Sequence, residues 1–139
     1  MNSQFINKPV AVMNEKLEFG VALNALAHMC FGLGSTSNPT EMRLSNYVDA
    51  DGGSHPNISE MPFIILKANS NKIRTLRQAA LETGIKFVDF TSTMTGAGYA
   101  EQIELTKQTK EADLQYYGIV LFGEWNAVSE LTRKFSLWR

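Results

Sequence analysis

The chain has 139 residues, of which 44% are hydrophobic and 19% charged, and its formal net charge at pH 7 is −1. These values are typical of one globular domain with a sizeable core, and they exclude an intrinsically disordered chain. Without an overall positive charge, bulk binding of nucleic acid through its phosphates is not expected.

The cysteine content and the N-terminus favour the cytoplasm. Cys30 is the one cysteine, so no intrachain disulfide can form, which favours a reducing compartment. Residues 1–4 show no basic region followed by an apolar run, so we expect no signal peptide. The longest apolar stretch, 21–33, contains Asn24 and His28 and is shorter than the roughly 20 apolar residues that span a bilayer, so no membrane partner is expected.

The first two predicted elements are a strand and a helix. Residues 9–13 form a short apolar run with β-branched side chains, which predicts a buried strand. Residues 20–32 are rich in alanine and leucine, lack proline and have glycine at both ends, which predicts a helix that ends at a glycine C-cap. Because this helix is apolar almost all round, we expect it to be buried rather than half-exposed.

The next stretch, 34–61, is the least regular in the chain. Residues 43–49 fit a strand and Asp51 with Gly52 fits a turn, so a hairpin and a long lid-like loop both remain open. Residues 62–68 are nearly continuously apolar and predict a central strand covered on both faces.

Residues 70–83 predict a helix, with Ser70 as its N-cap and Gly84 as its C-cap. An alternating strand is expected over 85–90 and a loop rich in hydroxyl groups and glycine over 91–99. Residues 100–113 fit a helix or a hairpin equally well.

The last elements complete an α/β order. Residues 116–122 predict a buried strand, and 125–135 predict a helix with one apolar face. The whole order predicts one α/β domain over residues 1–139, with a mixed, partly parallel sheet and helices packed on both faces.

Asn24 and His28 are the first candidate functional residues, because a spacing of four places them on one face of the predicted helix. Two interpretations remain open. They either satisfy their polar groups within the core, or line a pocket in which His28 is a general base or an orienting donor. Asn14 ends the preceding strand, at the edge of the sheet where sites of α/β proteins lie.

The loop 89–98 is the second candidate. Its hydroxyl groups and two glycines can bind a phosphate or another polar small molecule through backbone donors, or can form a simple polar turn. It has neither the spacing of a dinucleotide fingerprint nor the lysine of a P-loop.

Metal and cofactor sites are not expected. Residues 49–60 imitate the acidic spacing of an EF-hand, but Ser54 stands where that loop needs glycine and Pro56 interrupts it, so we interpret the segment as a turn. His28, His55 and Cys30 are the only soft ligands, too few for a structural zinc site.

Several segments together resemble a known family. They are 20–28 (GVALNALAH), the loop 51–56, the strand 64–67, Asp89-Phe90-Thr91, and the ends 117–119 and 135–139 of the last region. With these, nearly the full chain resembles a bacterial family described as a domain of unknown function, the one numbered two thousand. The resemblance implies an α/β sandwich related in fold to the archaeal and eukaryotic type of peptidyl-tRNA hydrolase.

The resemblance to the hydrolase is partial at the site. Gly20 and His28 match residues of the hydrolase's first helix, whereas Val21 stands where that helix has a lysine and Asn24 lies one position before its glutamine. The strand-end aspartate corresponds to Asp89, and the following threonine to Thr91 or Thr93. The missing lysine removes a cation that a tRNA-handling enzyme needs, so the resemblance implies the fold and the place of the pocket but not the reaction.

These observations predict a pocket for a small molecule at the first helix, formed by six residues. They are Asn14, Asn24, His28, Asp89, Thr91 and Thr93. In an enzyme, His28 or Asp89 is the catalytic base, the threonines orient the substrate, and Asn24, His28 and Asp89 converge on one ligand atom.

Two alternatives remain open. One is a hydrolase related to peptidyl-tRNA hydrolase. The other is a non-catalytic module that forms a homodimer through an aromatic surface of Trp125, Phe135 and Trp138, unless these side chains simply close the core.

Overall fold

The computed structural model describes residues 4–139. The expectation that the N-terminus has no signal peptide rests on residues 1–4, and residues 1–3 lie outside the described residues. Its elements, in chain order, are β1 (Asn7–Asn14), α1 (Phe19–Ser35), α2 (Pro39–Met42), β2 (Leu44–Val48), β3 (Ser54–Ser59), β4 (Ile64–Ala68), α3 (Ser70–Thr83), β5 (Lys86–Thr91), η1 (Ser92–Met94), α4 (Tyr99–Gln108), η2 (Glu111–Asp113), β6 (Tyr116–Glu124), α5 (Trp125–Thr132) and β7 (Ser136–Leu137).

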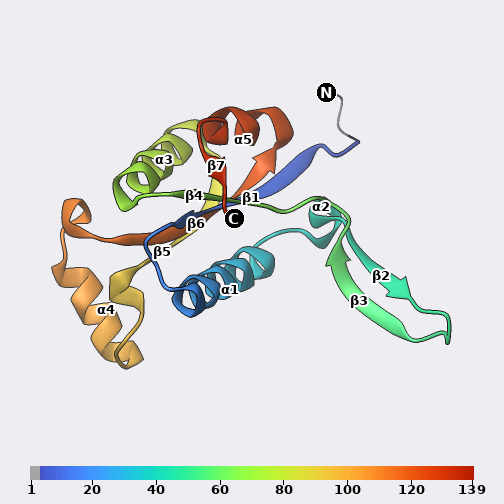
Figure 1. Cartoon of the computed structure of the whole chain (residues 1–139), viewed down its shortest axis with the longest axis horizontal. Helices are drawn as coiled ribbons and strands as arrows, with labels where there is room; N and C mark the ends of the chain where they lie inside the picture. Colours follow the sequence, from blue (N-terminus) through green and yellow to red (C-terminus); the bar gives the residue numbers. More distant parts are fainter. Residues whose placement is uncertain (1–3) are drawn as a thin grey trace.

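The main sheet has the strand order β5-β6-β1-β4-β7. β1 and β4 are parallel, whereas β1–β6, β5–β6 and β4–β7 are antiparallel. α3 and α5 cover one face of this sheet and α1 covers the other (Figure 1). The predicted fold class, a mixed and partly parallel sheet with helices on both faces, is confirmed.

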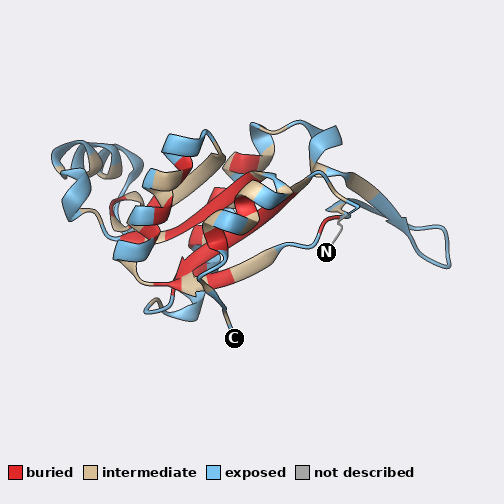
Figure 2. Ribbon diagram, turned by 90° about the horizontal axis from the view of Figure 1, so that it is seen from above, coloured by how far each residue is buried: buried red, intermediate tan, exposed pale blue. Residues whose placement is uncertain are grey.

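The core has two layers because successive side chains of a strand point to opposite faces. In the middle strand, Val10 and Val12 pack beneath α3 and α5, whereas Ala11 and Met13 pack beneath α1. Burial is concentrated in the central strands and in the inner faces of the helices (Figure 2). A strand buried on both faces is continuously apolar, which is why the sequence made it easy to find.

The first helix differs from its prediction in length and burial. α1 continues past Gly32 to Ser35, and the hydroxyl of Thr36 then donates to the carbonyl of Gly32 at 3.0 Å. Its outer face is open: Phe19 is 72% and Phe31 73% exposed. The expectation that this helix is buried rather than half-exposed is therefore wrong, because α1 packs on the sheet through one side only.

The third helix confirms its predicted bounds. Gly84 is its C-cap, as expected, and adopts the left-handed conformation with φ 72°. The N-cap is Asn69 rather than Ser70, since the Asn69 side chain accepts the backbone N–H of Lys72 at 2.9 Å. The hydroxyl of Ser70 instead accepts the backbone N–H of Tyr116 at the start of β6.

The structure also decides between the open alternatives. Strands β2 and β3 form a hairpin that extends away from the sheet, and α4 is a helix beside β5 at the opposite end (Figure 1). α5 ends at Thr132, earlier than predicted, and the short strand β7 then pairs with β4. Among residues 4–139, no helix is both long and apolar enough to cross a membrane.

Candidate functional site

A cavity of about 620 Å³ lies between α1, the edge strand β5 and α4; we call it the α4 pocket. Its lining residues are His28, Met29, Val88, Asp89, Phe90, Met94, Tyr99, Gln102, Ile103, Thr106 and Lys107. The lining is mostly apolar, with a few polar groups, which is the usual character of a small-molecule site.

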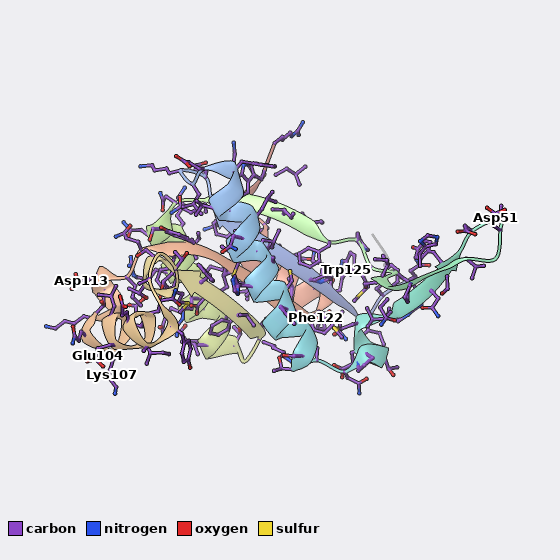
Figure 3. All side chains as sticks on the ribbon, turned by 90° about the horizontal axis from the view of Figure 1, so that it is seen from below. Asp51, Glu104, Lys107, Asp113, Phe122 and Trp125 are labelled. Carbon is purple, nitrogen blue, oxygen red and sulfur yellow. The ribbon has the colours of Figure 1, made fainter. Side chains whose placement is uncertain are left out.

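Two elements build the walls of the α4 pocket. On β5, Val88 and Phe90 face the α1 side of the sheet, because they pack in the core layer beneath that helix. On α4, the spacing of Tyr99, Ile103 and Thr106 places all three on one helical face. α4 stands beside α1 at the edge of the sheet, with Lys107 on its solvent-facing side (Figure 3). The pocket is therefore open to solvent.

His28 is one of the polar residues of the lining, with Tyr99 and Lys107, whose side chains have no hydrogen-bond partner among residues 4–139. Its side chain is exposed, and its ring centroid lies 5.6 Å from that of Phe90, with the two planes tilted by 32°. Phe90 in turn lies 6.1 Å from Tyr117, so the three rings form a row. Within residues 4–139, no atom hydrogen-bonds a ring nitrogen of His28. A neutral imidazole can therefore donate from one nitrogen and accept at the other toward a ligand.

Asp89 lines the α4 pocket, but its carboxylate is already paired. It accepts a hydrogen bond from Arg77 Nε at 2.8 Å, and the two side chains are 15% and 29% exposed. Arg77 belongs to α3, which covers the other face of the sheet. Because its neighbours Val88 and Phe90 face α1, the side chain of Asp89 points to the α3 face of the sheet. Asp89 thus borders the same cavity as His28 through its position in β5, while its carboxylate is bound to Arg77.

Thr91 and Thr93 lie behind the pocket rather than in its lining. Both are buried, and their Oγ1 atoms are 2.8 Å apart. The Oγ1 of Thr106, which lines the pocket, lies 2.8 Å from Thr93 Oγ1 and 2.8 Å from the carbonyl oxygen of Gln102. These hydroxyl groups join the end of β5 to α4 and hold the pocket's wall in place.

Asn14 and Asn24 are outside the lining. The buried Asn14 donates through Nδ2 to the carbonyl of Tyr116 at 2.9 Å, and its Oδ1 accepts the backbone N–H of Lys16 at 3.0 Å. Asn14 therefore joins the end of β1 to the start of β6. Asn24 is exposed on α1, one turn before His28. Of the six residues predicted from the sequence, the α4 pocket itself contains His28 and Asp89.

The sequence did not predict the wall of the pocket that α4 forms, which we call the α4 wall. Residues 100–113 fitted a helix or a hairpin equally, so Tyr99, Gln102, Ile103, Thr106 and Lys107 were not assigned to the site. The spacing of Tyr99, Ile103 and Thr106, four and then three residues apart, is the signal that could have found this wall.

A metal centre has no basis in the described residues. Among residues 4–139, no three His, Cys, Asp or Glu side chains gather in a way that could hold a metal ion. In the turn before β3, Asp49 accepts the backbone N–H groups of Asp51 and Gly53 and lies 2.9 Å from His55 Nε2. That carboxylate shapes the hairpin turn, in agreement with the expected turn.

Comparisons with known proteins agree on the fold. The family model described as "Protein of unknown function (DUF2000)" matches residues 7–139. A solved structure of a protein of unknown function, Atu0240 from Agrobacterium tumefaciens strain C58, is similar with a TM-score of 0.84 and 18% sequence identity, over 98% of this chain and 100% of that one. At this identity the likeness shows the fold alone. No curated protein sequence matches this one significantly.

Proposed function

The chain belongs to the family described as Protein of unknown function (DUF2000), and we propose that its α4 pocket binds a small molecule that hydrogen-bonds to His28. The observation that carries the proposal is the state of His28. Its ring nitrogens have no partner within residues 4–139, and it stands beside Phe90 at a cavity of about 620 Å³. Ligand pockets of proteins have volumes of roughly 300–1,000 Å³.

The lining indicates the chemical class of the ligand. Phe90 and Tyr99 offer aromatic surfaces, and Val88 and Ile103 add aliphatic ones, so a flat, largely apolar body fits the walls. Among the polar residues of the lining, His28, Gln102 and Lys107 can donate hydrogen bonds to a ligand. The favoured ligand is therefore an aromatic small molecule that carries a hydrogen-bond acceptor.

A thermal-shift screen tests this proposal. The screen covers nucleosides and nucleotides, aminoacyl and peptidyl adducts, and aromatic acids, against wild type, His28→Ala and Asn24→Ala. Asn24 is the matched control because it is exposed on α1, one turn before His28, and lies outside the lining. A ligand that binds only the native state raises the melting temperature.

We expect a compound that stabilises wild type and Asn24→Ala by several degrees and does not stabilise His28→Ala. The three proteins should melt at similar temperatures without ligand, because both replaced side chains are exposed. A compound that stabilises all three proteins equally would place its site elsewhere.

Hydrolysis is a narrower alternative at the same pocket. The resemblance to peptidyl-tRNA hydrolases in fold supports it, as do Gly20 and His28 on the first helix. Because the carboxylate of Asp89 is paired with Arg77, His28 is the group free to accept a proton from water in this alternative. Incubation with peptidyl-tRNA tests it, with a cleavage product from wild type and Asn24→Ala but not from His28→Ala. A cytoplasmic location in a bacterium remains part of this proposal, supported by the single cysteine.

Self-association through α1 is the second candidate function. α1 contains no Asp, Glu, Lys or Arg, although Leu23 is 50% and Phe31 73% exposed. Nothing lies in front of this helix when the molecule is seen from below (Figure 3). An exposed apolar face without charges is typical of an interface, and the small side chains of Gly20 and Ala27 would let a second α1 approach closely. This face favours a homodimer over the aromatic surface expected from the sequence, because Phe135 and Trp138 pack against the core.

A further inference from the structure

A second cavity lies on the opposite face of the sheet, between α3 and the end of α5; we call it the α3–α5 pocket. Its volume is about 460 Å³. α3 and α5 pack on one core layer, whereas the α4 pocket adjoins the layer beneath α1. None of its lining residues belongs to the α4 pocket, so the two sites are separate.

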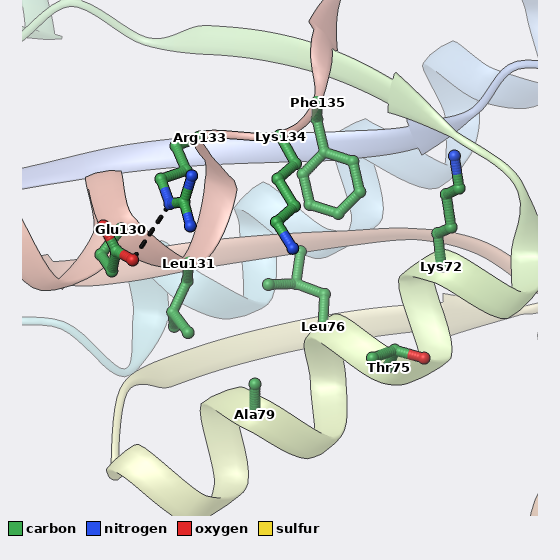
Figure 4. A pocket seen from close by; sticks show the side chains of 9 residues that line it. All are labelled: Lys72, Thr75, Leu76, Ala79, Glu130, Leu131, Arg133, Lys134 and Phe135. Atoms are coloured by element: carbon green, nitrogen blue, oxygen red, sulfur yellow. Dashed lines mark hydrogen bonds and ion pairs between the residues drawn. The ribbon is translucent and has the colours of Figure 1, made fainter.

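The floor of the α3–α5 pocket is apolar. Leu76 on α3 is buried, and Leu131 and Phe135 pack against the same core layer. Ala79 completes the α3 side without filling the space. Figure 4 shows the ring of Phe135 standing between the side chains of Lys134 and Lys72, above Leu76. An apolar group that enters the pocket would therefore rest on Leu76, Leu131 and Phe135.

The rim of the pocket is basic. Lys72, Arg133 and Lys134 contribute three positive charges, and Glu130 is the single acidic residue in the lining. Glu130 is already bound to Arg133, with 3.0 Å between Oε1 and Nε. Neither Lys72 nor Lys134 pairs with a carboxylate anywhere in residues 4–139. The rim thus has a formal charge of +2 on a protein whose net charge is −1.

The electrostatics of the helix ends explain the positions of two of the three cations in this rim. Arg133 and Lys134 follow the last residue of α5, where cations are favourable to the helix dipole. Lys72 is different, because it occupies the first turn of α3, where a cation is unfavourable and an anion is favourable. No acidic residue stands in that turn. An anion at this rim would be attracted by the unpaired Lys72 and Lys134, and near Lys72 also by the start of the helix.

We infer that the α3–α5 pocket binds a small organic acid with an apolar body, with the acid at Lys72 and Lys134 and the body on Leu76, Leu131 and Phe135. Paired charge and apolar contact are both required for this class, because an acid without an apolar body would remain solvated at exposed lysines. The inference is independent of the function proposed for the α4 pocket.

Titration of the protein with octanoate, followed by backbone amide chemical shifts, tests the inference. Octan-1-ol is the matched ligand without charge. The variant Lys72→Gln/Lys134→Gln removes two rim cations, and Lys16→Gln/Lys110→Gln is the matched control, because all four lysines are exposed and the net charge changes equally. Both variants should fold as wild type does, since exposed substitutions have small effects.

We expect saturable octanoate binding with shifts confined to α3, α5 and the following residues 133–135, unchanged in the control variant and in His28→Ala. In Lys72→Gln/Lys134→Gln the affinity should fall at least tenfold, and octan-1-ol should bind wild type at least tenfold more weakly than octanoate. Equal affinity for octanoate and octan-1-ol, equal affinity in the two double variants, absence of saturable binding, or shifts centred on α1 and α4 would each overturn the inference.

Discussion

At the scale of single residues, the side chains that stabilise the fold have hydrogen-bond partners within the protein, whereas the candidate functional residue, His28, has none among residues 4–139. Asn14 and Thr93 are buried, and each is bound to another strand or helix, so they hold the fold together. Buried polar groups are costly unless they are paired, which explains why both side chains have hydrogen-bond partners. His28 differs from them because it is exposed and its ring nitrogens have no partner within residues 4–139.

The pair of Asp89 and Arg77 gives a first prediction. Asp89→Ala removes the 2.8 Å hydrogen bond and leaves Arg77, which is 29% exposed, without its carboxylate. We expect the free energy of unfolding to fall by about 2 kcal/mol, the usual cost of losing a hydrogen bond to a charged group. Urea unfolding measures this change.

Glu130→Ala is the control for Asp89→Ala. It removes an exposed pair with Arg133, whose side chains are 72% and 61% exposed, so its effect should stay within about 0.5 kcal/mol. Equal stability of the two variants would contradict the structural role of Asp89.

Tyr116 gives a prediction about pH. Burial, and then the hydrogen bond that its hydroxyl donates to Glu111 at 2.6 Å, raises the pKa of Tyr116 to about 12. The fold thus favours the protonated phenol, whose unfolded pKa is about 10. Its contribution to stability is complete below about pH 10 and is lost as the pH rises toward about 12.

The ultraviolet absorbance of tyrosinate, recorded during an alkaline titration of the folded protein, measures this pKa. Wild type should show an ionisation step near pH 12 that Tyr116→Phe lacks. If the two titration curves differed only near the ordinary range, about pH 10, the raised pKa would be refuted.

At the scale of elements, Gly84 tests why α3 ends where it does. Its φ of 72° is a left-handed conformation that a side chain disfavours, so Gly84→Ala should destabilise the protein by about 1 kcal/mol. Gly20→Ala is the control. Gly20 lies in α1 with open space around an added methyl group, so alanine should be neutral or stabilising there. Thermal unfolding compares the two, and an equal loss of stability in both would contradict the explanation.

Local signals explain how much of the fold could be predicted. α3 has an apolar face and a C-cap glycine, and its bounds were correct. β7 has two residues and forms by pairing with the edge of β4, so the sequence of these two residues alone does not predict a strand. The direction in which α1 faces could not be predicted either, because a helix that is apolar all round does not show which side the sheet covers.

Only the part of the candidate site on α1 and β5 could be predicted from the sequence, and the part on α4 could not. His28 was found because it is a polar residue in an apolar helix, and Asp89 because it lies near the end of a strand. The α4 wall depends on how a half-polar helix stands against the edge strand, which is a tertiary contact. The pairing of Asp89 on β5 with Arg77 on α3 also joins residues of two elements that the sequence does not relate.

At the scale of the whole molecule, the two faces of the sheet have different surfaces. The α1 face carries the α4 pocket and an uncharged helix, whereas the α3 and α5 face carries a basic pocket. Although the formal net charge of the chain is −1, the basic pocket and the uncharged helix α1 lie on opposite faces of the sheet. This separation allows a second copy to cover α1 while the α3–α5 pocket stays open.

Self-association through α1 predicts a specific effect of one leucine. Leu23→Lys puts a charge on the outer face of α1 and should convert a dimer to a monomer, because burying an unpaired charge is unfavourable. Leu81→Lys is the matched control, since Leu81 on α3 is also 50% exposed. Sedimentation velocity at several concentrations measures the change. A wild-type chain that stays monomeric at its highest soluble concentration would contradict the dimer.

The most direct test of the central claim, that the α4 pocket binds a small molecule through His28, is a map of the binding site by backbone amide chemical shifts. The measurement uses the compound that stabilises wild type most in the thermal screen, added to wild type, Asn24→Ala and His28→Ala. The account predicts shifts centred on α1, β5 and α4, around His28, Phe90 and Ile103, in the first two proteins and not in His28→Ala. Shifts that persist in His28→Ala, or that lie outside these three elements, would contradict it.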